Sequence, residues 1–321
     1  MTKLVLLDGA NLAYRVIHRV TESRTQGGAE VAGVLEFALE LAGLLNRLKP
    51  TYFAVAWDTP RKGYVRRKLW SGYKANRPEV ADEPVRYQLR WIKELVRASG
   101  VPCIEAEGWE ADDVVATVLA KFTGVYTEAV IIARDKDYHQ LVSSKVRVYD
   151  GEAWTDERVV RERWGVEPRN VVEVQTLAGD SSDAVPGIEG IGLKRAADLV
   201  KRYGSAEAAI DGATSLSPKM TGRFMEFDYK LGRALVELNK DVVVIEKGLR
   251  PNGPVHDVRQ LAFDGLNYVT LTPVFEELGF TPWWRLEKIV DNPSKGDSVR
   301  DVTVPDVHPV PPLRSSSPVA G

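Results

Sequence analysis

The chain has 321 residues, which suffice for one large domain or two smaller ones with a buried core. Its single cysteine, Cys103, excludes an intramolecular disulfide and fits a reducing compartment. The formal net charge of -2 argues weakly against nucleic-acid binding, but segments 61–77 and 192–202 are basic while acids gather elsewhere. Neither a secretion signal nor an apolar stretch of about 18 residues is visible, so we expect no membrane association.

Short apolar runs of strand length, each bounded by turn residues, recur in the first half of the chain: Lys3–Leu7, Tyr52–Trp57, Ala129–Ala133 and Val146–Tyr149. Helical patterns separate these runs over Val31–Leu48, residues 85–96 and Glu110–Lys121. The alternation of strands and helices predicts an α/β fold with a central, mostly parallel sheet flanked by helices.

The character of the sequence changes after about residue 155. Helical and glycine-rich segments replace the apolar strands, so we expect one domain over 1–155 and a helical subdomain over 156–290. Pro, Ser and Asp dominate from residue 291 to residue 321, and aromatic residues vanish. Such a composition cannot bury enough apolar surface to order itself, so this tail is predicted to be disordered.

Acidic residues stand where the predicted strands end and where a predicted helix begins: Asp8, Asp58, Asp135 and Asp137, then Glu110, Asp112 and Asp113. Ligands of open parallel sheets bind beyond the carboxyl ends of the strands, so the acids should share one edge. A turn or helix-cap role is the simpler interpretation of any single acid. The whole set favours a metal site, and oxygen ligands without a His or Cys cluster favour Mg²⁺ or Mn²⁺.

Residues 61–77 contain seven cations and no acid, namely Arg61, Lys62, Arg66, Arg67, Lys68, Lys74 and Arg77. Tyr64, Trp70 and Tyr73 are interleaved with them. Cations suit phosphates and aromatic faces suit unstacked bases, so the segment could hold a single strand of nucleic acid. A charged loop that only improves solubility is the alternative, although Trp70 and Tyr73 are poor solubilising residues.

A glycine-rich turn, Gly187–Gly192, opens a predicted helix that carries Lys194, Arg195, Lys201 and Arg202. Glycines let the backbone approach a phosphate closely, and helix N-termini bind anions. Taken alone, the pattern also fits an ordinary turn between two helices.

Seven motifs, in order, resemble those of the bacterial and bacteriophage 5′–3′ exonucleases of the flap-endonuclease family. They are Leu6–Asn11 followed by Tyr14-Arg15, Ala56–Asp58, Gly72–Arg77, Glu110–Asp113, Asp135–Asp137, Gly179–Asp183 and Pro186–Gly192. The order and spacing agree over roughly residues 3–245, which far exceeds a lone pattern match.

The resemblance implies a PIN-like catalytic domain over 1–155 with a basic helical arch at about 61–85. It also implies a helix–hairpin–helix motif at about 179–203 in the helical subdomain, with a monovalent cation such as K⁺ at the hairpin. Two Mg²⁺ ions, which Mn²⁺ can replace, would be held by two groups of acids. The first group is Asp8, Asp58, Glu110, Asp112 and Asp135; the second is Asp137, Asp180 and Asp183, with Asp113 close by.

The resemblance also assigns roles in handling DNA. Lys74 and Arg77 would contact the scissile phosphate and stabilise the charge that grows in the transition state. Other DNA contacts are expected from Tyr14, Arg15, Arg66, Arg67, Lys68, Tyr73, Gly187, Gly190, Gly192, Lys194, Arg195 and Lys201. The chain departs from the family at Ala184, where Asn is usual; we expect a lost local hydrogen bond and not a lost ligand.

We therefore expect a stand-alone, monomeric 5′ nuclease of replication and repair in a bacterial or phage-infected cytoplasm, working beside replication proteins. Its substrates would be DNA with 5′ flaps, nicks or ends, and RNA primers on DNA. A non-catalytic DNA-junction binder is one alternative, against which the complete acidic set argues. An RNase of the wider PIN-like group is another, but the minimal RNases lack both the arch and the hairpin.

Overall fold

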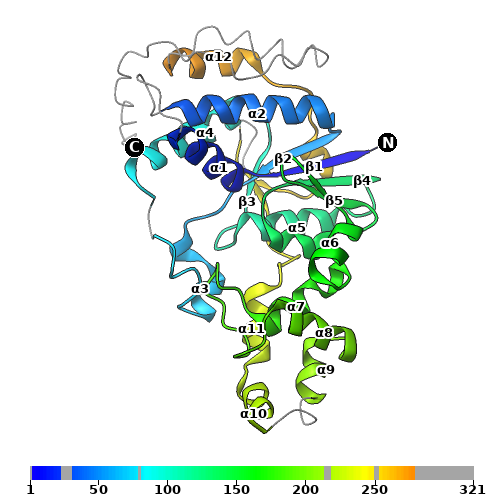
Figure 1. Cartoon of the computed structure of the whole chain (residues 1–321). Coiled ribbons are helices and arrows are strands. Elements are labelled where there is room, and N and C mark those ends of the chain that lie inside the picture. The colour runs from blue at the N-terminus through cyan, green and yellow to red at the C-terminus, as the bar shows by residue number, and fades with distance from the viewer. Residues whose placement is uncertain (1, 23–30, 79–80, 213–217, 249–252, 279–321) are drawn as a thin grey trace. The chain divides into compact units, whose positions relative to one another are not determined.

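The computed structural model describes residues 2–22, 31–78, 81–212, 218–248 and 253–278 (Figure 1). The predicted disordered tail at 291–321 lies outside the described residues, as do residues 279–290 of the predicted helical subdomain. No helix of the described residues is long and apolar enough to cross a membrane.

Contacts divide the chain into two compact units. The first unit comprises Met1–Leu12, Pro50–Ala81 and Val101–Asp264, and it holds the sheet. The second comprises Ala13–Lys49, Asp82–Gly100 and the described residues from Gly265 onward. These units follow contacts, so the expected domain boundary near residue 155 stays a prediction.

The sheet of the first unit has the strand order β6-β5-β4-β1-β2-β3-β7-β8. The strands are β1 (Lys3–Asp8), β2 (Tyr52–Ala56), β3 (Cys103–Glu105), β4 (Glu128–Ile132), β5 (Val146–Tyr149), β6 (Trp154–Thr155), β7 (Ile245–Glu246) and β8 (Gly253–Pro254). β1 to β5 pair in parallel, whereas β6, β7 and β8 pair antiparallel at the edges. The mostly parallel sheet is confirmed.

Near-continuous apolar sequence explains the central strands. β1 lies between β2 and β4, and Leu4, Leu6 and Leu7 of β1 are fully buried. Strands buried on both faces read as such apolar runs. Helix α5 (Ala111–Lys121) packs on β1, β2 and β3, and Val114, Val115 and Val118 join the same core (Figure 1).

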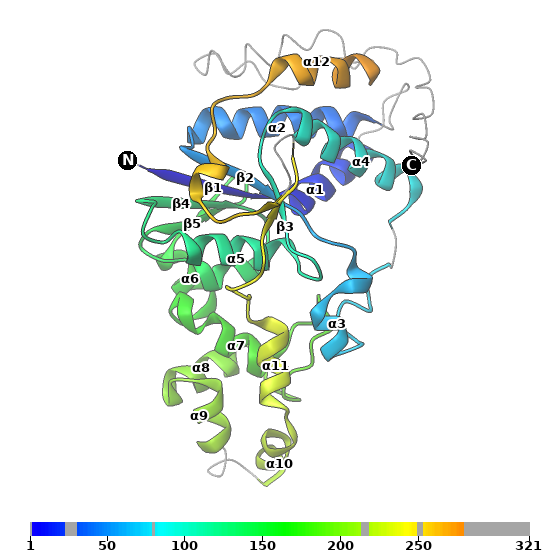
Figure 2. The same cartoon turned by 180° about the vertical axis from the view of Figure 1, so that it is seen from behind.

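Helices follow the sheet within the first unit: α6 (Glu157–Trp164), α7 (Val171–Ala178), α8 (Leu193–Tyr203), α9 (Ala206–Asp211), α10 (Pro218–Glu226) and α11 (Tyr229–Val236). α7 packs against both α8 and α11, as Figures 1 and 2 show from opposite sides. The first unit also contains the short elements η2 (Arg61–Gly63), α3 (Val65–Leu69), η3 (Lys136–Leu141) and η4 (Pro168–Asn170). A further short helix, η6 (Val258–Leu261), lies beside β2. The predicted helical region after 155 is thus present.

The second unit is helical. It contains most of α1 (Gly9–Glu22), together with α2 (Ala32–Leu48), α4 (Glu83–Ala98) and α12 (Tyr268–Glu277). α2 packs on α4, where the buried Gln88 side chain accepts a hydrogen bond from the Gly33 amide at 2.9 Å. The predictions of α2 and α4 are confirmed, whereas α1 was not anticipated.

Two glycines allow two stretches of backbone, the end of α7 and the loop that follows it, to lie very close together. A Cβ atom on Gly187 would lie 2.2 Å from the carbonyl carbon of Ala178 and 2.4 Å from the nitrogen of Gly179. Gly179 itself has φ of +70°, a conformation that favours glycine. The loop that leads from α7 towards α8 therefore requires glycine at both positions.

We predict that Gly187→Ala lowers the free energy of unfolding by about 1–3 kcal/mol, because the backbones must move apart to admit the methyl group. Gly192→Ala is the matched control, since a Cβ there meets nothing within 4 Å. Chemical denaturation of both variants beside the parent chain measures the difference. Equal stability of the two variants would show that the close approach does not matter.

Candidate metal and nucleic-acid site

Three acids lie beyond the carboxyl ends of neighbouring parallel strands. Asp8 ends β1, Asp58 follows β2, and Asp135 follows β4. The Asp8 carboxylate accepts hydrogen bonds from the Asn11 amide and the Tyr138 hydroxyl, both at 2.9 Å. The Asp58 carboxylate accepts one at 2.8 Å from the Ala111 amide, at the start of α5. The parallel register therefore gathers these acids as the sequence predicts.

The Asp8 carboxyl group is buried and lies near other acids. Burial, followed by the charge of Asp58, raises this pKa to about 7, although Asn11 and Tyr138 donate to the carboxylate. A divalent cation would relieve such repulsion.

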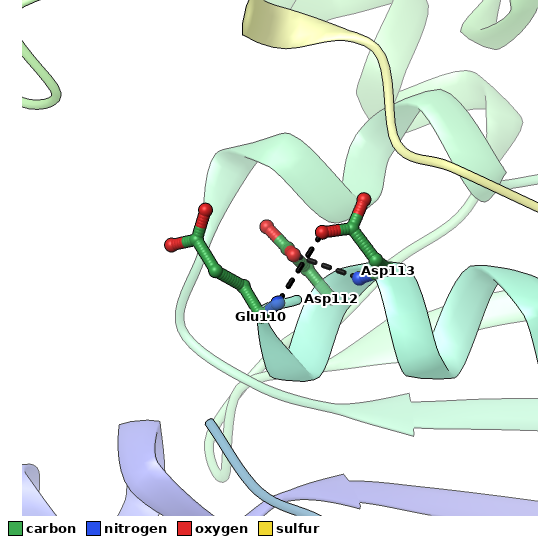
Figure 3. Close-up of side chains that lie close together, drawn as sticks. All are labelled: Glu110, Asp112 and Asp113. Atoms are coloured by element: carbon green, nitrogen blue, oxygen red, sulfur yellow. Dashed lines mark hydrogen bonds between the residues drawn. The ribbon is translucent and has the colours of Figure 1, made fainter. Parts of the chain in front are cut away.

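The start of α5 supplies three more acids, drawn in Figure 3. Oxygen atoms of Glu110, Asp112 and Asp113 lie within 4.8 Å of one another. Glu110 caps the helix, and its amide donates to the Asp113 carboxylate. Burial and the charges of Asp113 and Glu110 raise the pKa of Asp112 well above its usual value. An all-oxygen set of crowded carboxylates fits a hard divalent cation.

Asp113 differs from its neighbours because a buried arginine donates to both of its carboxylate oxygens. Arg66 of α3 donates to both of its oxygens at 2.6 and 2.8 Å, and the Asn239 amide donates at 2.8 Å. Arg66 also donates to Glu110 at 3.2 Å and to the Glu237 carbonyl at 2.9 Å. This pair ties α3 to the start of α5 and to the chain beyond α11.

Two expected DNA contacts are corrected by their burial. Arg66 and Tyr73 are each only 3% exposed. The Tyr73 hydroxyl donates to Glu110 at 2.7 Å, and its ring packs in an apolar cluster with Val185 and Leu235. Both side chains therefore anchor the basic segment to the protein interior and do not offer a surface to nucleic acid.

The second predicted group of acids also assembles. Asp137 opens η3, while Asp180 and Asp183 lie on the loop after α7. Burial, then the charges of Asp135 and Asp180, raises the pKa of Asp137 to about 7. Burial alone would raise the pKa of Asp180, but Lys136 at 2.6 Å and Ser182 hold it below the usual value.

Lys74 joins the two groups of acids. Its ammonium group pairs with Glu110 and lies 3.4 Å from Asp183, while Arg77 also pairs with Asp183. Burial opposes the charge of Lys74, but the charges of Glu110 and Asp183 raise its pKa above the usual value. The two cations assigned to catalysis therefore meet the acids directly.

The Gly72–Arg77 segment docks on the loop that carries Asp180 and Asp183. The Lys74 amide donates to the Asp183 carbonyl at 2.7 Å, and Asn76 donates to the Ser181 carbonyl at 3.1 Å. Ala184 has φ of +55°, a left-handed conformation that Asn tolerates better than Ala. The departure from the family pattern at Ala184 therefore carries a conformational cost besides any lost hydrogen bond.

The glycine-rich turn leads into α8 as predicted, with Gly192 at the helix start. Lys194, Arg195 and Lys201 are exposed on α8, and Arg195 donates to the Gly190 carbonyl at 3.0 Å. An open cavity of about 1010 Å³ lies between α8, α6 and the end of β4, and Asp135, Lys136, Lys194 and Lys201 are among its lining residues. The cavity therefore has basic residues of α8 on one side and Asp135 on another.

The remaining side chains expected to contact DNA are Arg67, Lys68, Tyr14 and Arg15. Arg67 is half-buried and Lys68 is exposed on α3. Tyr14 and Arg15 belong to the second unit, where Arg15 pairs with Glu40 and the exposed Tyr14 ring stacks on His18.

Residue-by-residue reasoning missed two donors to the carboxylates. Tyr138, expected only to pack, is fully buried and donates to Asp8. Gln175, which carries no motif signal, donates to Asp137 at 2.5 Å. His139 accepts a hydrogen bond from Trp164 at 2.8 Å, in keeping with a structural role.

The first unit combines a sheet that gathers carboxylates at one edge with a helix, α8, that carries exposed basic residues. This combination is expected of a metal-dependent nuclease. Family models described as "5'-3' exonuclease, N-terminal resolvase-like domain" and "5'-3' exonuclease, C-terminal SAM fold" match residues 3–165 and 166–251. The chain belongs to the 5′–3′ exonuclease family, which confirms the predicted nuclease class and its PIN-like fold.

Individual proteins agree with this assignment. The chain is 34% identical to the 5′–3′ exonuclease of Aquifex aeolicus, over 79% of this chain and 88% of that protein. It is 35% identical to DNA polymerase I of Rhizobium leguminosarum over 74% of its length, but spans only 25% of that polymerase.

Solved structures share the fold at low identity. The T5 D15 protein, crystallised with metal ions, has a TM-score of 0.63 at 21% identity, covering 74% of this chain and 89% of that chain. The catalytic core of Rad2 in complex with DNA has a TM-score of 0.58 at 15% identity, covering 91% and 92%.

We predict that Arg66→Met lowers the free energy of unfolding by about 3–5 kcal/mol, because it leaves the buried Asp113 charge uncompensated. Lys68→Met on the same short helix is the control, since Lys68 is exposed. Thermal and chemical denaturation measure both variants. An Arg66→Met protein as stable as Lys68→Met would contradict an anchoring role for the pair.

Proposed function

We propose that this chain is a structure-specific 5′ nuclease that hydrolyses phosphodiester bonds in DNA with 5′ flaps, nicks or ends. RNA primers on DNA are a further substrate. One observation carries the proposal: Lys74, on the basic segment, lies against Glu110 of the first group of acids and Asp183 of the second. A phosphate drawn to that segment would therefore stand next to both groups.

The first divalent ion would be held by Asp8, Asp58, Glu110, Asp112 and Asp135, and the second by Asp137, Asp180 and Asp183. Asp113 is left out because Arg66 and the Asn239 amide use its carboxylate. Mg²⁺ suits the all-oxygen ligands, and Mn²⁺ can substitute. When bound, such a pair of ions activates water and stabilises the leaving oxygen.

The cations of the chain bind and orient the phosphate. Lys74 and Arg77 place positive charge where the acids converge, and fixed charges of this kind stabilise the negative charge that grows on the phosphate. The exposed Lys194, Arg195 and Lys201 of α8 would grip the duplex backbone without reading its sequence. A K⁺ ion at the hairpin belongs to this proposal.

The relatives suggest the setting. The Aquifex aeolicus relative is named a 5′–3′ exonuclease, and the Rhizobium leguminosarum relative is named DNA polymerase I. The solved neighbours include structures with metal ions and with DNA. We therefore propose a monomer that acts in replication and repair in the bacterial or phage-infected cytoplasm, beside replication proteins.

We predict that Asp135→Asn abolishes cleavage of a 5′-labelled flap substrate in Mg²⁺ while leaving the fold intact. The fold survives because an amide oxygen can still accept the hydrogen bond from the Asp137 amide. Asp228→Asn, at the start of α11 outside both groups, is the control and should cleave normally. Sizing the products, with a chelator arm, separates flap endonuclease from exonuclease.

The same assay can overturn the proposal. Normal turnover by Asp135→Asn would remove Asp135 from the site. Intact DNA with a stable gel shift by the unaltered chain would support the non-catalytic junction binder instead.

We predict that Lys74→Ala slows single-turnover cleavage by about 10²–10³-fold, as expected for the loss of one group that stabilises transition-state charge. Binding should suffer less, because the other basic residues of the arch and hairpin remain. Lys62→Ala in the same segment is the control, since Lys62 is exposed. Filter binding in Ca²⁺ gives the affinity, and an unchanged cleavage rate would sink the assignment.

A further inference from the structure

Gln175 is a buried polar side chain that touches the second group of acids. It lies on α7, is 1% exposed, and donates from Nε2 to the Asp137 carboxylate at 2.5 Å. Its Oε1 atom is buried and has no hydrogen-bond partner among the described residues. An unsatisfied buried acceptor destabilises the folded state. An apolar residue would avoid that cost, which argues that the amide serves the site.

The position of Gln175 on the chain links the members of the second group. Its carbonyl accepts the helix-ending hydrogen bond from Gly179 at 2.8 Å, directly before Asp180. Asp137 belongs to η3, 38 residues before Gln175 in the sequence. The amide therefore fastens Asp137 to the helix that directly precedes the loop of Asp180 and Asp183.

Asp137 depends on this amide because its cationic neighbour is engaged elsewhere. Lys136 pairs with Asp180 at 2.6 Å and donates to Ser182 at 3.2 Å. A donor aimed at a carboxylate forms a strong, directional hydrogen bond.

We propose that Gln175 is a positioning residue that orients the Asp137 carboxylate towards Asp180 and Asp183, so that the three can bind one divalent cation. The inference rests on the proposed function, which makes these three acids the ligands of the second ion. Residues that orient metal ligands through a hydrogen bond typically change metal affinity about 10–100-fold when they are removed.

The test measures metal binding without substrate. Gln175→Met keeps an unbranched side chain and removes the donor. Gln140→Met is the matched control, because Gln140 lies in the same unit and its side chain hydrogen-bonds, among the described residues, to the main chain of Val236 and Leu238 and to no acid. Titration with Mn²⁺, followed by electron paramagnetic resonance of the free ion, should show one site weakened about 10–100-fold in Gln175→Met. Gln140→Met should bind as the parent chain does.

A second readout uses flap cleavage. The Mg²⁺ concentration for half-maximal rate should rise in Gln175→Met, whereas the rate at saturating Mg²⁺ should return close to that of the parent chain. A purely structural role would lower the rate at every Mg²⁺ concentration. If Gln175→Met fails to fold by circular dichroism, Gln175→Asn, with an amide one methylene shorter, is tested with the same expected result.

The outcomes separate this inference from the proposed function. If the parent chain binds no Mn²⁺, or Asp137→Asn binds it equally well, the proposed second site fails. If Asp137→Asn loses one ion but Gln175→Met binds both as the parent chain does, the positioning role alone is overturned.

Discussion

Mutual repulsion among half-buried and buried carboxylates is the constraint on which this structure depends. Parallel strands and a helix start bring the acids together; burial, and then the charges of neighbouring acids, raises the pKa of Asp8 and that of Asp137 to about 7. Fixed donors limit the repulsion: Tyr138 serves Asp8 and Gln175 serves Asp137. The surrounding fold supplies at least one hydrogen-bond donor to each of these acids that is not already paired with a cation.

The basic segment takes part in this compensation. Arg66 neutralises Asp113 inside the protein, so α3 is held to α5 by a charge pair that water does not reach. Lys74 and Arg77 lie further along the segment and pair with acids that are candidates to bind metal. The buried pair of Arg66 and Asp113 therefore anchors the segment. The pairs of Lys74 with Glu110 and of Arg77 with Asp183 lie nearer its C-terminal end, where a phosphate or a metal ion could replace one partner.

Local sequence patterns predicted the central strands and the position of the acids at their ends, because an apolar run followed by an aspartate indicates both a strand and the residue at which it ends. They failed where a partner lies far along the chain. The cations of residues 61–77 look alike in sequence, yet Arg66 is buried by acids 44 and 47 residues away while Lys68 is exposed. Gln175 could not be found for the same reason, and strands as short as β7 and β8 contain too few residues to show a period.

The close approach of Gly179 and Gly187 fixes the loop that joins the proposed metal site to the proposed duplex-binding helix α8. Asp180 pairs with Val185 through main-chain hydrogen bonds of 2.8 and 3.0 Å, and the Ile188 amide donates to Leu177 at 2.8 Å. The loop that carries Asp180 and Asp183 is thereby closed on itself immediately before the hairpin. Because so few residues join the acids to the start of α8, the distance between the proposed metal site and the proposed duplex grip is set by this loop. The position of the cut relative to the duplex should therefore follow from the geometry of the loop and not from recognition of bases.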